Sequence, residues 1–492
     1  MSTLSICRGP TRVQPKLIHA ARKSQRITSR CLTSKPPPDP HHPVTSLPKP
    51  RLNYRDMAVN VVYKSHNAFN RKAPLPIGSI QAIPRLYAEQ KAISKRLDEK
   101  RRCRSTIGER IRLAAKDPTE KHLALEEAKS LKEEVATLEL KLEEVEEELF
   151  RVALGVPNDT HPEVPIGPES AATVLSHYGP EPLPAFPHRD HVAVATALEL
   201  VDFEAGAAVS GTSWYYLMNE GALLEMALTN YAMSIAIKHG FMPVTTPDVV
   251  RADIASRCGF QPRDEQLDSP VSQMYHINHY LPELVLAGTA EIPLAGMFAN
   301  QILSEDKLPV KVVGLGRAFR AEAGARGTDT RGLYRVHQFT KLELFAVSSE
   351  AHSEAVMEDL KTIQLEIFNG LGLPFRVLDM PTEELGASAY RKYDIEAWMP
   401  GRGSWGEISS TSNCTDYQSR RLHIRYRCKG ETGLPFAHTL NGTAAAIPRL
   451  IVALIENGVR FDGAGNAIGL DLPRVLQPFW VQGGRRDLIR WV

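Results

Sequence analysis

A sustained heptad repeat is the feature that most narrows what this chain can fold into. Apolar side chains alternate at spacings of three and four without a break at Ala128, Leu131, Val135, Leu138, Leu142, Val145 and Leu149. This period of about 3.5 residues is the seam of a coiled coil. A looser version runs from Pro84 to about residue 116, and Asp117-Pro118 breaks both periods. The pattern predicts an antiparallel arm of two long helices, joined by a turn at residues 115–122.

Charge is divided unevenly between these two helices. The second carries a run of glutamates between residues 126 and 148, whereas the first is mainly basic and includes Arg101, Arg102, Arg104, Arg110 and Arg112. These charges either pair across the hairpin and keep it soluble, or the basic side meets RNA phosphates, each of which would add salt-sensitive affinity. The charges alone favour neither interpretation.

The composition is that of a soluble enzyme. A length of 492 residues allows two or three domains, and a net charge of +2 indicates no nucleic-acid partner by itself. No apolar run reaches the roughly 18 residues that a membrane span needs, so we expect no membrane partner. The six cysteines are far apart and form no CxxC pair, which argues against a zinc ribbon or a disulfide framework. No GxxxxGK run is present, which excludes a P-loop.

The first residues have the character of a targeting leader. Residues 1–38 contain basic but no acidic side chains, and a Pro-rich stretch follows at residues 35–50. Basic, acid-free leaders are typical of mitochondrial presequences, while a disordered basic tail that touches RNA is the alternative. We therefore expect residues 1–50 to be a presequence and linker, and the mature protein to lie in the mitochondrial matrix.

The segment richest in ligand-type side chains runs from residue 319 to 343. Its candidates are Arg320, Glu322, Arg335, Phe339 and Glu343. A single residue lies between Arg320 and Glu322, and the last three recur every four residues along a strand-like run from Leu333 to Phe345, so each set shares a face. Guanidinium groups suit phosphates, a ring suits adenine, and a carboxylate accepts from an amino group. The pattern predicts an ATP site on a hairpin; a solvated hairpin with ion pairs is the alternative.

Three further segments carry side chains of the same kinds. Thr289 and Glu291 offer a hydroxyl and a carboxylate to an ammonium group, or cap and begin a helix. Residues 407–410 contain a glutamate and two serines, whose hard oxygens suit Mg²⁺. Thr443 and Arg449 lie in a small-residue stretch that we expect to open a helix.

In this order, the segments resemble the motifs of class II aminoacyl-tRNA synthetases. The wording FRAEAG…DTRGL…HQF and the block EISSTSNC resemble the seryl-tRNA synthetase family in particular, from about Pro84 to Val492. HGFMPVTTPDVV, residues 239–250, resembles motif 1, with motif 2 at residues 319–343 and motif 3 at residues 436–449. The resemblance implies an α+β fold with an antiparallel β-sheet catalytic core flanked by helices, and an N-terminal antiparallel α-helical coiled-coil arm. The domains implied are residues 51–165 for tRNA binding and residues 166–492 for aminoacylation.

The resemblance also implies a role for each candidate. The catalytic residues would be Arg320, Arg335 and Arg449. Serine would be bound by Thr289, Glu291, Arg320, Glu343 and Thr443. ATP would be bound by Arg320, Glu322, Arg335, Phe339, Glu407, Ile408, Ser409, Ser410 and Arg449, with Mg²⁺ on Glu407 and Ser410. The five arm arginines would contact tRNA(Ser), and motif 1 would form a homodimer. The implied activity is that of a serine–tRNA ligase, serving mitochondrial translation.

Other functions stay open at this point. A catalytically silent relative could keep the fold as an RNA-binding module, which pyrophosphate exchange would distinguish. A structural coiled-coil protein would leave the ligand-type segments unexplained. A synthetase for threonine or proline is a further alternative, although the lack of a Cys/His metal set disfavours threonine.

Overall fold

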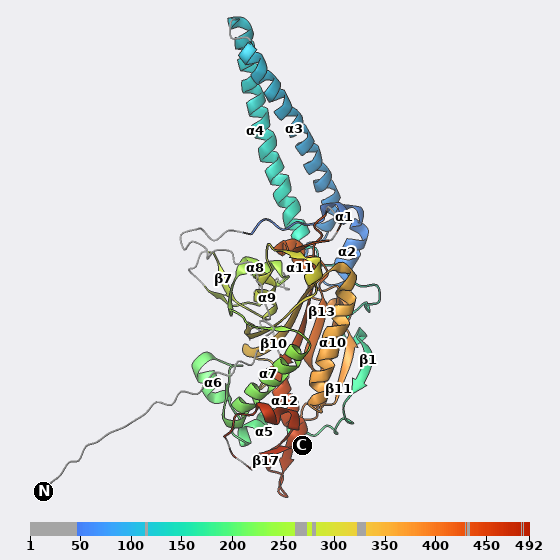
Figure 1. The fold of residues 1–492 in the computed structure, drawn as a ribbon, viewed down its shortest axis with the longest axis vertical. Coiled ribbons are helices and arrows are strands. Elements are labelled where there is room, and N and C mark those ends of the chain that lie inside the picture. Colours follow the sequence, from blue (N-terminus) through green and yellow to red (C-terminus); the bar gives the residue numbers. More distant parts are fainter. Residues whose placement is uncertain are drawn as a thin grey trace, which may run out of the picture. The chain divides into compact units, whose positions relative to one another are not determined.

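One eight-stranded β-sheet organises the fold (Figure 1). The computed structural model describes residues 47–113, 117–260, 273–277, 282–321, 331–428, 430, 433–483, 485 and 487–492. Within this part of the chain the strands lie in the order β1 (Thr173–Tyr178), β11 (Phe375–Asp379), β12 (Arg391–Met399), β13 (Ser404–Asn413), β15 (His438–Ala446), β10 (Gln338–Ser348), β9 (Val310–Phe319) and β4 (Met242–Thr245). Neighbouring strands are antiparallel, except that β4 pairs with β9 in parallel. The predicted fold class is confirmed.

The two faces of this sheet are covered by different layers. One face packs against the helices α7 (Asn219–Lys238), α10 (Ser353–Gly370) and α12 (Ile447–Gly458), and the side chains of Leu342 and Leu344 on β10 belong to that core. Phe345 on the same strand packs into a separate core, with the helices α8 (Ala252–Arg257), α9 (Glu291–Met297) and α11 (Tyr417–Leu422). Because side chains alternate along a strand, the odd-numbered residues of β10 all face this second layer.

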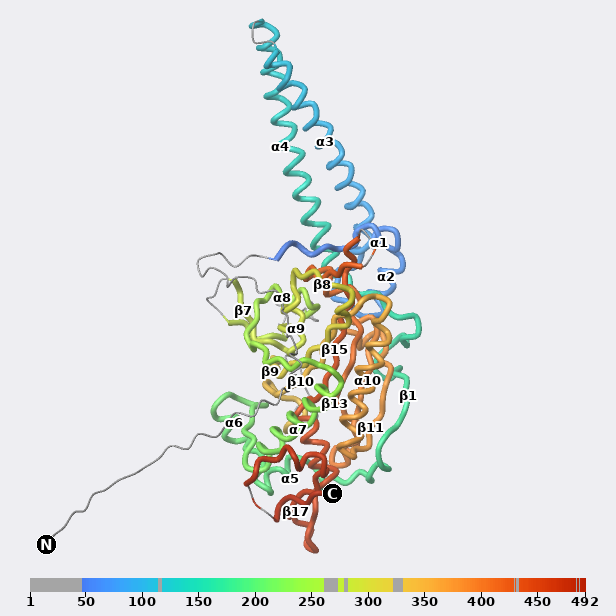
Figure 2. The backbone as a smooth tube through the Cα atoms, in the orientation of Figure 1, coloured from blue at the N-terminus to red at the C-terminus, as the bar shows by residue number. Residues whose placement is uncertain are grey.

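The predicted helical arm is confirmed. Its helices are α3 (Ile83–Leu113) and α4 (Pro118–Gly155), which lie side by side (Figure 2). Every predicted seam position of α4 is buried or half-buried. The turn is shorter than predicted, because residues 118–122 already belong to α4. Asp117 caps this helix by accepting hydrogen bonds from the backbone N–H groups of Thr119 and Glu120. Pro118 therefore begins the helix, where its missing N–H costs nothing, and does not interrupt it.

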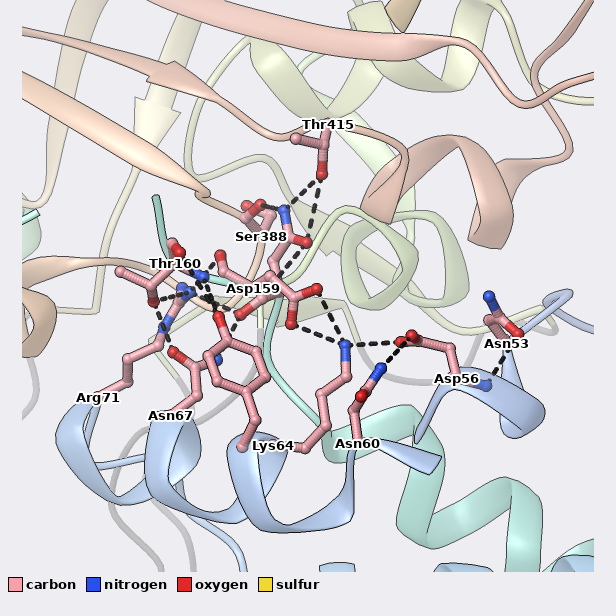
Figure 3. A network of polar contacts seen from close by, with 12 residues as sticks. Asn53, Asp56, Asn60, Lys64, Asn67, Arg71, Asp159, Thr160, Ser388 and Thr415 are labelled. Atoms are coloured by element: carbon pink, nitrogen blue, oxygen red, sulfur yellow. Dashed lines mark hydrogen bonds and ion pairs between the residues drawn. The ribbon is translucent and has the colours of Figure 1, made fainter. Parts of the chain in front are cut away.

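A polar network joins the short helices before the arm to the body that carries the sheet (Figure 3). These helices are α1 (Tyr54–Val59) and α2 (Val61–Asn70). Lys64 on α2 binds Asp159 at 2.7 Å, and Arg71 donates to the carbonyl oxygens of Asn158 and Gly386. The side chain of Asn158 in turn donates to the carbonyl of Ser388 at 2.8 Å. Buried polar groups that are satisfied in this way fix how two segments pack.

The remaining elements are short. The helices are α5 (His191–Ala197) and α6 (Phe203–Ser210). The strands are β2 (Val201–Asp202), β3 (Tyr216–Leu217), β5 (Val249–Arg251), β6 (His276–Ile277), β7 (Leu284–Leu286), β8 (Ile302–Ser304), β14 (Arg425–Arg427), β16 (Val459–Phe461), β17 (Ala467–Leu472) and β18 (Ile489–Trp491). The strand predicted before Pro247 is β4. Among the described residues, the helices are all too short or too polar to span a bilayer.

Candidate active site

The hairpin predicted to bind ATP is formed by β9 and β10, but the strand bounds at its connection differ from those predicted. β9 ends at Phe319, so Arg320 is the first residue beyond it, and β10 begins at Gln338, so Arg335 lies in the connection and not on the strand. Arg320 still faces Phe339, with its guanidinium carbon 5.3 Å from the centre of the ring. Glu322 lies outside the described residues. The hairpin itself is therefore confirmed, while the shared strand face predicted for Arg335 is wrong.

A pocket brings most of the predicted ligands together. It opens between β10, β13, β15 and the start of α12 and is lined by Arg320, Leu333, Tyr334, Arg335, Val336, Phe339, Lys341, Glu407, Ile408, Ser409, Ser410, Thr443, Ala446, Pro448 and Arg449. The three predicted catalytic arginines are all among these residues. The arm arginines are on α3 and do not line this pocket.

A buried polar cluster adjoins this pocket. The Oγ1 atom of Thr289 lies 3.4 Å from Oε2 of Glu343, and Nζ of Lys341 lies 2.6 Å from the same carboxylate. Thr443 stands directly opposite Glu343 in the pairing of β15 with β10. All four residues are less than a tenth exposed. The predicted serine ligands Thr289, Glu343 and Thr443 therefore meet on one face of the sheet.

Glu291 lies at the edge of the same cluster. It is the first residue of α9, and its backbone N–H donates to Oγ1 of Thr289, which lies just before the cap residue Ala290. Its Oε1 atom accepts from Gln418 at 2.6 Å. Burial, and secondly the nearby carboxylate of Glu343, raise the pKa of Glu291 to about 7. The combined negative charge of Glu291 and Glu343 favours an ammonium group beside them.

Arg449 and Glu407 also line the pocket and form an ion pair with each other. Arg449, on the first turn of α12, donates to the carboxylate of Glu407 at 2.9 Å and to the carbonyl of Tyr334 at 3.2 Å. Pro448 occupies the first turn of this helix, as predicted. Burial alone would raise the pKa of Glu407, but Arg449 and then Lys392 hold it well below its usual range. Glu407 is therefore ionised throughout the physiological range and can act as a ligand for a cation.

The donor set beside Glu407 fits Mg²⁺. An irregularity of β13 at Ile408 lets Glu407 and Ser410 point to the same side although they are three residues apart. Asp394 stands opposite Ser410 in the pairing of β12 with β13. One oxygen of its carboxylate is buried and has no hydrogen-bond partner among the described residues. Oxygen ligands of this kind are what Mg²⁺ selects.

Besides Asp394, the residues of this site that were not predicted include Lys341, Tyr334 and Gln418. Lys341 bridges Thr289 and Glu343, and its position midway between Phe339 and Glu343 on one strand face was a signal that could have identified it. Tyr334 accepts from Arg449 through its backbone, and Gln418 reaches Glu291 from α11. Neither of these two contacts has a local sequence pattern.

Two family models match the chain. The model described as tRNA synthetase class II core domain (G, H, P, S and T) matches residues 275–458, and the Seryl-tRNA synthetase N-terminal domain model matches residues 69–160. A serine–tRNA ligase of Treponema denticola is 41% identical over 432 residues, which cover 87% of this chain and 98% of that relative. The chain belongs to the seryl-tRNA synthetase family.

Other members of the seryl-tRNA synthetase family are similarly related. A mitochondrial serine–tRNA ligase of Schizosaccharomyces pombe is 42% identical over 435 residues, covering 87% of this chain and 88% of the relative. A solved structure, seryl-tRNA synthetase from Pyrococcus horikoshii complexed with ATP, has a TM-score of 0.76 and 32% identity, covering 87% and 98% of the two chains. The match to the synthetase core, residues 275–458, contains all the predicted ligands of serine and ATP.

Proposed function

We propose that this chain is a serine–tRNA ligase that activates serine with ATP to seryl-adenylate and transfers it to the 3′ end of tRNA(Ser). The observation that carries the proposal is the pocket, where three arginines, the Phe339 ring and an ionised Glu407 surround a space that adjoins a buried polar cluster. Guanidinium groups suit phosphates, and the polar cluster suits a small hydroxylated amino acid. No side chain in this scheme acts as a nucleophile.

Activation follows from positioning and charge. The carboxylate of serine attacks the α-phosphorus of ATP, and pyrophosphate leaves. Arg320 contacts the α-phosphate and the serine carboxylate, while Arg335 and Arg449 bind the terminal phosphates. Phe339 stacks on adenine, and the predicted contact of Glu322 with the adenine amino group stays a prediction. Glu407 and Ser410, with Ile408 and Ser409 between them, would hold Mg²⁺, which would supply positive charge to the phosphates.

The buried cluster selects serine. Thr289 and Glu291 receive its α-amino group, and Glu343 and Thr443 bind its hydroxyl. This assignment is supported by their burial and by the direct pairing of Glu343 with Thr443 across β10 and β15. A site built to hydrogen-bond a hydroxyl rejects an analogue without one, because its own polar groups then remain unpaired.

Replacing Thr443 with valine is expected to lower discrimination of serine over alanine by roughly 1–3 kcal/mol. Valine keeps the volume of threonine but removes its donor and acceptor, so the serine hydroxyl loses a partner. The measurement is the ratio of kcat/KM for serine and alanine in pyrophosphate exchange, with the KM for ATP as the internal control. An unchanged ratio would mean that Thr443 does not contact the hydroxyl.

The arm, within the proposed tRNA-binding domain of residues 51–165, contacts tRNA(Ser). Its five arginines divide into two sets. Arg101 pairs with Glu139 at 2.9 Å, and Arg110 pairs with Glu120 and Glu127. Arg102, Arg104 and Arg112 are exposed and form no ion pair with any residue that the structure describes. Pairing across the hairpin is therefore supported for Arg101 and Arg110, and contact with RNA phosphates is supported for the other three arginines.

This division makes a matched pair of variants possible. Changing Arg102, Arg104 and Arg112 to glutamine is expected to weaken tRNA binding, and to reduce its salt slope by about one for each phosphate that is no longer neutralised. The control changes Arg101 and Arg110, whose replacement removes exposed, weakly stabilising ion pairs of the hairpin and should leave the salt slope nearly unchanged. Titrations with tRNA over a range of salt concentrations measure the binding affinity and its salt slope for both sets of variants. Equal effects of the two sets on the slope would contradict the assignment.

The homodimer and the mitochondrial location belong to the same proposal. Met242 is exposed on β4, the edge strand of the sheet, and Met226 and Ile237 are exposed on α7, which supports a motif 1 interface. Ultracentrifugation tests the dimer, since a monomer at micromolar concentration would contradict it.

The basic leader, outside the described residues, supports import to the matrix. Imaging a chain that lacks residues 1–50 should show that import is lost, while this truncated chain still activates serine.

A further inference from the structure

A buried histidine–glutamate pair lies just behind the pocket. His191 is the first residue of α5 and is 2% exposed, and Glu456, in the last turn of α12, is fully buried. The Nδ1 atom of His191 lies 3.0 Å from Oε1 of Glu456. Neither side chain lines the pocket, and neither has a part in the activation mechanism above.

The other nitrogen of the imidazole holds a pocket segment. The backbone N–H of Leu333 donates to Nε2 of His191 at 3.2 Å. A nitrogen that accepts carries no proton, so the proton of the neutral ring is on Nδ1 and is donated to Glu456. The carboxylate thereby fixes the tautomer that can accept from Leu333. Leu333 precedes Tyr334 and Arg335, and all three line the pocket.

The second oxygen of Glu456 holds another segment. It accepts from the backbone N–H groups of Gly401 and Arg402, at 2.7 and 3.0 Å. The guanidinium of Arg402 lies 3.8 Å from the centre of the Tyr334 ring, and that of Arg449 lies 4.7 Å from it. Glu456 follows Arg449 by seven residues, which is about two helical turns and places both on one side of α12.

The fit around the imidazole is close. Gly332 has a φ of +70°, and a Cβ atom there would come within 2.2 Å of Nε2 of His191. The neighbouring Asp190 binds the guanidinium of Arg331 at 2.8 Å. The start of α5 therefore holds the chain at Arg331 and Leu333, immediately before Arg335.

We propose that His191 and Glu456 are positioning residues for ATP. Together they lock residues 331–335 and the turn at residues 401–402 to α12, so that Arg335 and Arg449 meet the terminal phosphates at a preset separation. This proposal rests on the proposed function of the pocket. Asp190, His191 and Glu456 are also close enough together to hold a metal ion. Both ring nitrogens of His191 and both carboxylate oxygens of Glu456 already have partners in the protein, so their arrangement is explained without one.

The test is Glu456→Gln, with ATP and AMP binding measured by calorimetry in the presence of Mg²⁺. The amide that replaces the carboxylate has one oxygen and one –NH₂ group. In either orientation of the amide, the –NH₂ group faces another donor, namely the Nδ1–H of His191 or the N–H groups of Gly401 and Arg402, so at least one hydrogen bond is lost. We expect the Kd for ATP to rise about tenfold, in line with the loss of a buried hydrogen bond, and the Kd for AMP to change less than twofold. AMP lacks the two phosphates that Arg335 and Arg449 would bind.

Two comparisons separate positioning from stability. Glu220→Gln changes another buried carboxylate, which binds Arg485 at 2.8 Å away from the pocket. It should lower Tm and leave the ratio of the two Kd values at the parent value. His191→Phe should reproduce the selective loss of ATP affinity, and the double variant with Glu456→Gln should be no worse than the more severe single change, because the pair acts as one unit.

The outcomes are distinguishable. Unchanged ATP binding in folded variants, or equal loss of ATP and AMP binding, would overturn the positioning role. So would misfolding of both variants while Glu220→Gln folds, because the pair would then serve only the fold. Failure of the parent chain to bind ATP would refute the proposed function itself, and the positioning role with it.

Discussion

Replacing Arg320 with alanine is expected to reduce serine-dependent pyrophosphate exchange by about 10²–10³-fold, the loss typical for one preorganised donor. The side chain is held from two sides before any ligand binds. Its Nε atom donates to the carbonyl of Gly288 at 3.3 Å, and its guanidinium lies over the ring of Phe339. A cation that is already in place stabilises charge developing on the α-phosphate without reorganisation, whereas water that replaced it would have to reorient.

Two further variants serve as comparisons. For all of them, kcat/KM for ATP is measured in serine-dependent pyrophosphate exchange. Arg320→Lys keeps the charge but loses the planar fork that can bind phosphate and carboxylate together, so it should have an intermediate rate. Arg317, three residues earlier, binds Glu225 of α7 at 3.0 Å and does not line the pocket. Arg317→Ala should therefore exchange at nearly the parent rate. If Arg320→Ala also did so, Arg320 would have no part in activation.

The sequence predicted the arm well because its determinants are local. The heptad spacing of α4 needs no partner outside the hairpin to be recognised, and two polar side chains of α3 bind glutamates of α4. Gln90 donates to Glu146 at 3.1 Å, and Lys100 binds Glu134 at 2.5 Å. The end of the turn was misplaced because a proline marks a break or a first helical residue equally well, and the capping hydrogen bonds of Asp117 decide between them.

The pocket could be predicted only in part. The sequence picked out residues that the structure brings together around one pocket, because phosphates, adenine and ammonium groups each select a narrow set of side chains. The prediction that Arg335 lies on a strand was wrong. The conformation of this segment depends on a partner far away in sequence, the imidazole of His191, which accepts a hydrogen bond from the backbone of Leu333. Contacts of this kind, like that of Gln418 with Glu291, have no periodicity along the chain.

Serine binding is expected to weaken as pH falls below about 7, while ATP binding is not. Burial, followed by the charge of Glu343, raises the pKa of Glu291 to about 7. A protonated Glu291 no longer attracts the ammonium group of serine, which itself stays charged in this range. The kcat/KM for serine should therefore fall by roughly tenfold per pH unit below this pKa, as expected for one essential ionised group in the free enzyme. A profile for serine that is flat from pH 8 to pH 5.5 would contradict the role of Glu291.

The same shift makes Glu291 destabilising at neutral and alkaline pH. Its pKa in the folded chain lies above the ordinary value of 4.5, so between about pH 4.5 and 7 the folded chain binds more protons than the unfolded chain. The free energy of unfolding must then fall as pH rises through this window, by on the order of a few kcal/mol at about 1.36 kcal/mol per unit of pKa.

Glu291→Gln keeps an oxygen for Gln418 and cannot ionise. It should raise Tm at pH 8, leave Tm nearly unchanged at pH 4.5, and increase the KM for serine at least tenfold without affecting that for ATP. A lower Tm at pH 8 would show that the charged carboxylate stabilises the fold. In that case the selection of serine would impose no cost in stability at this position.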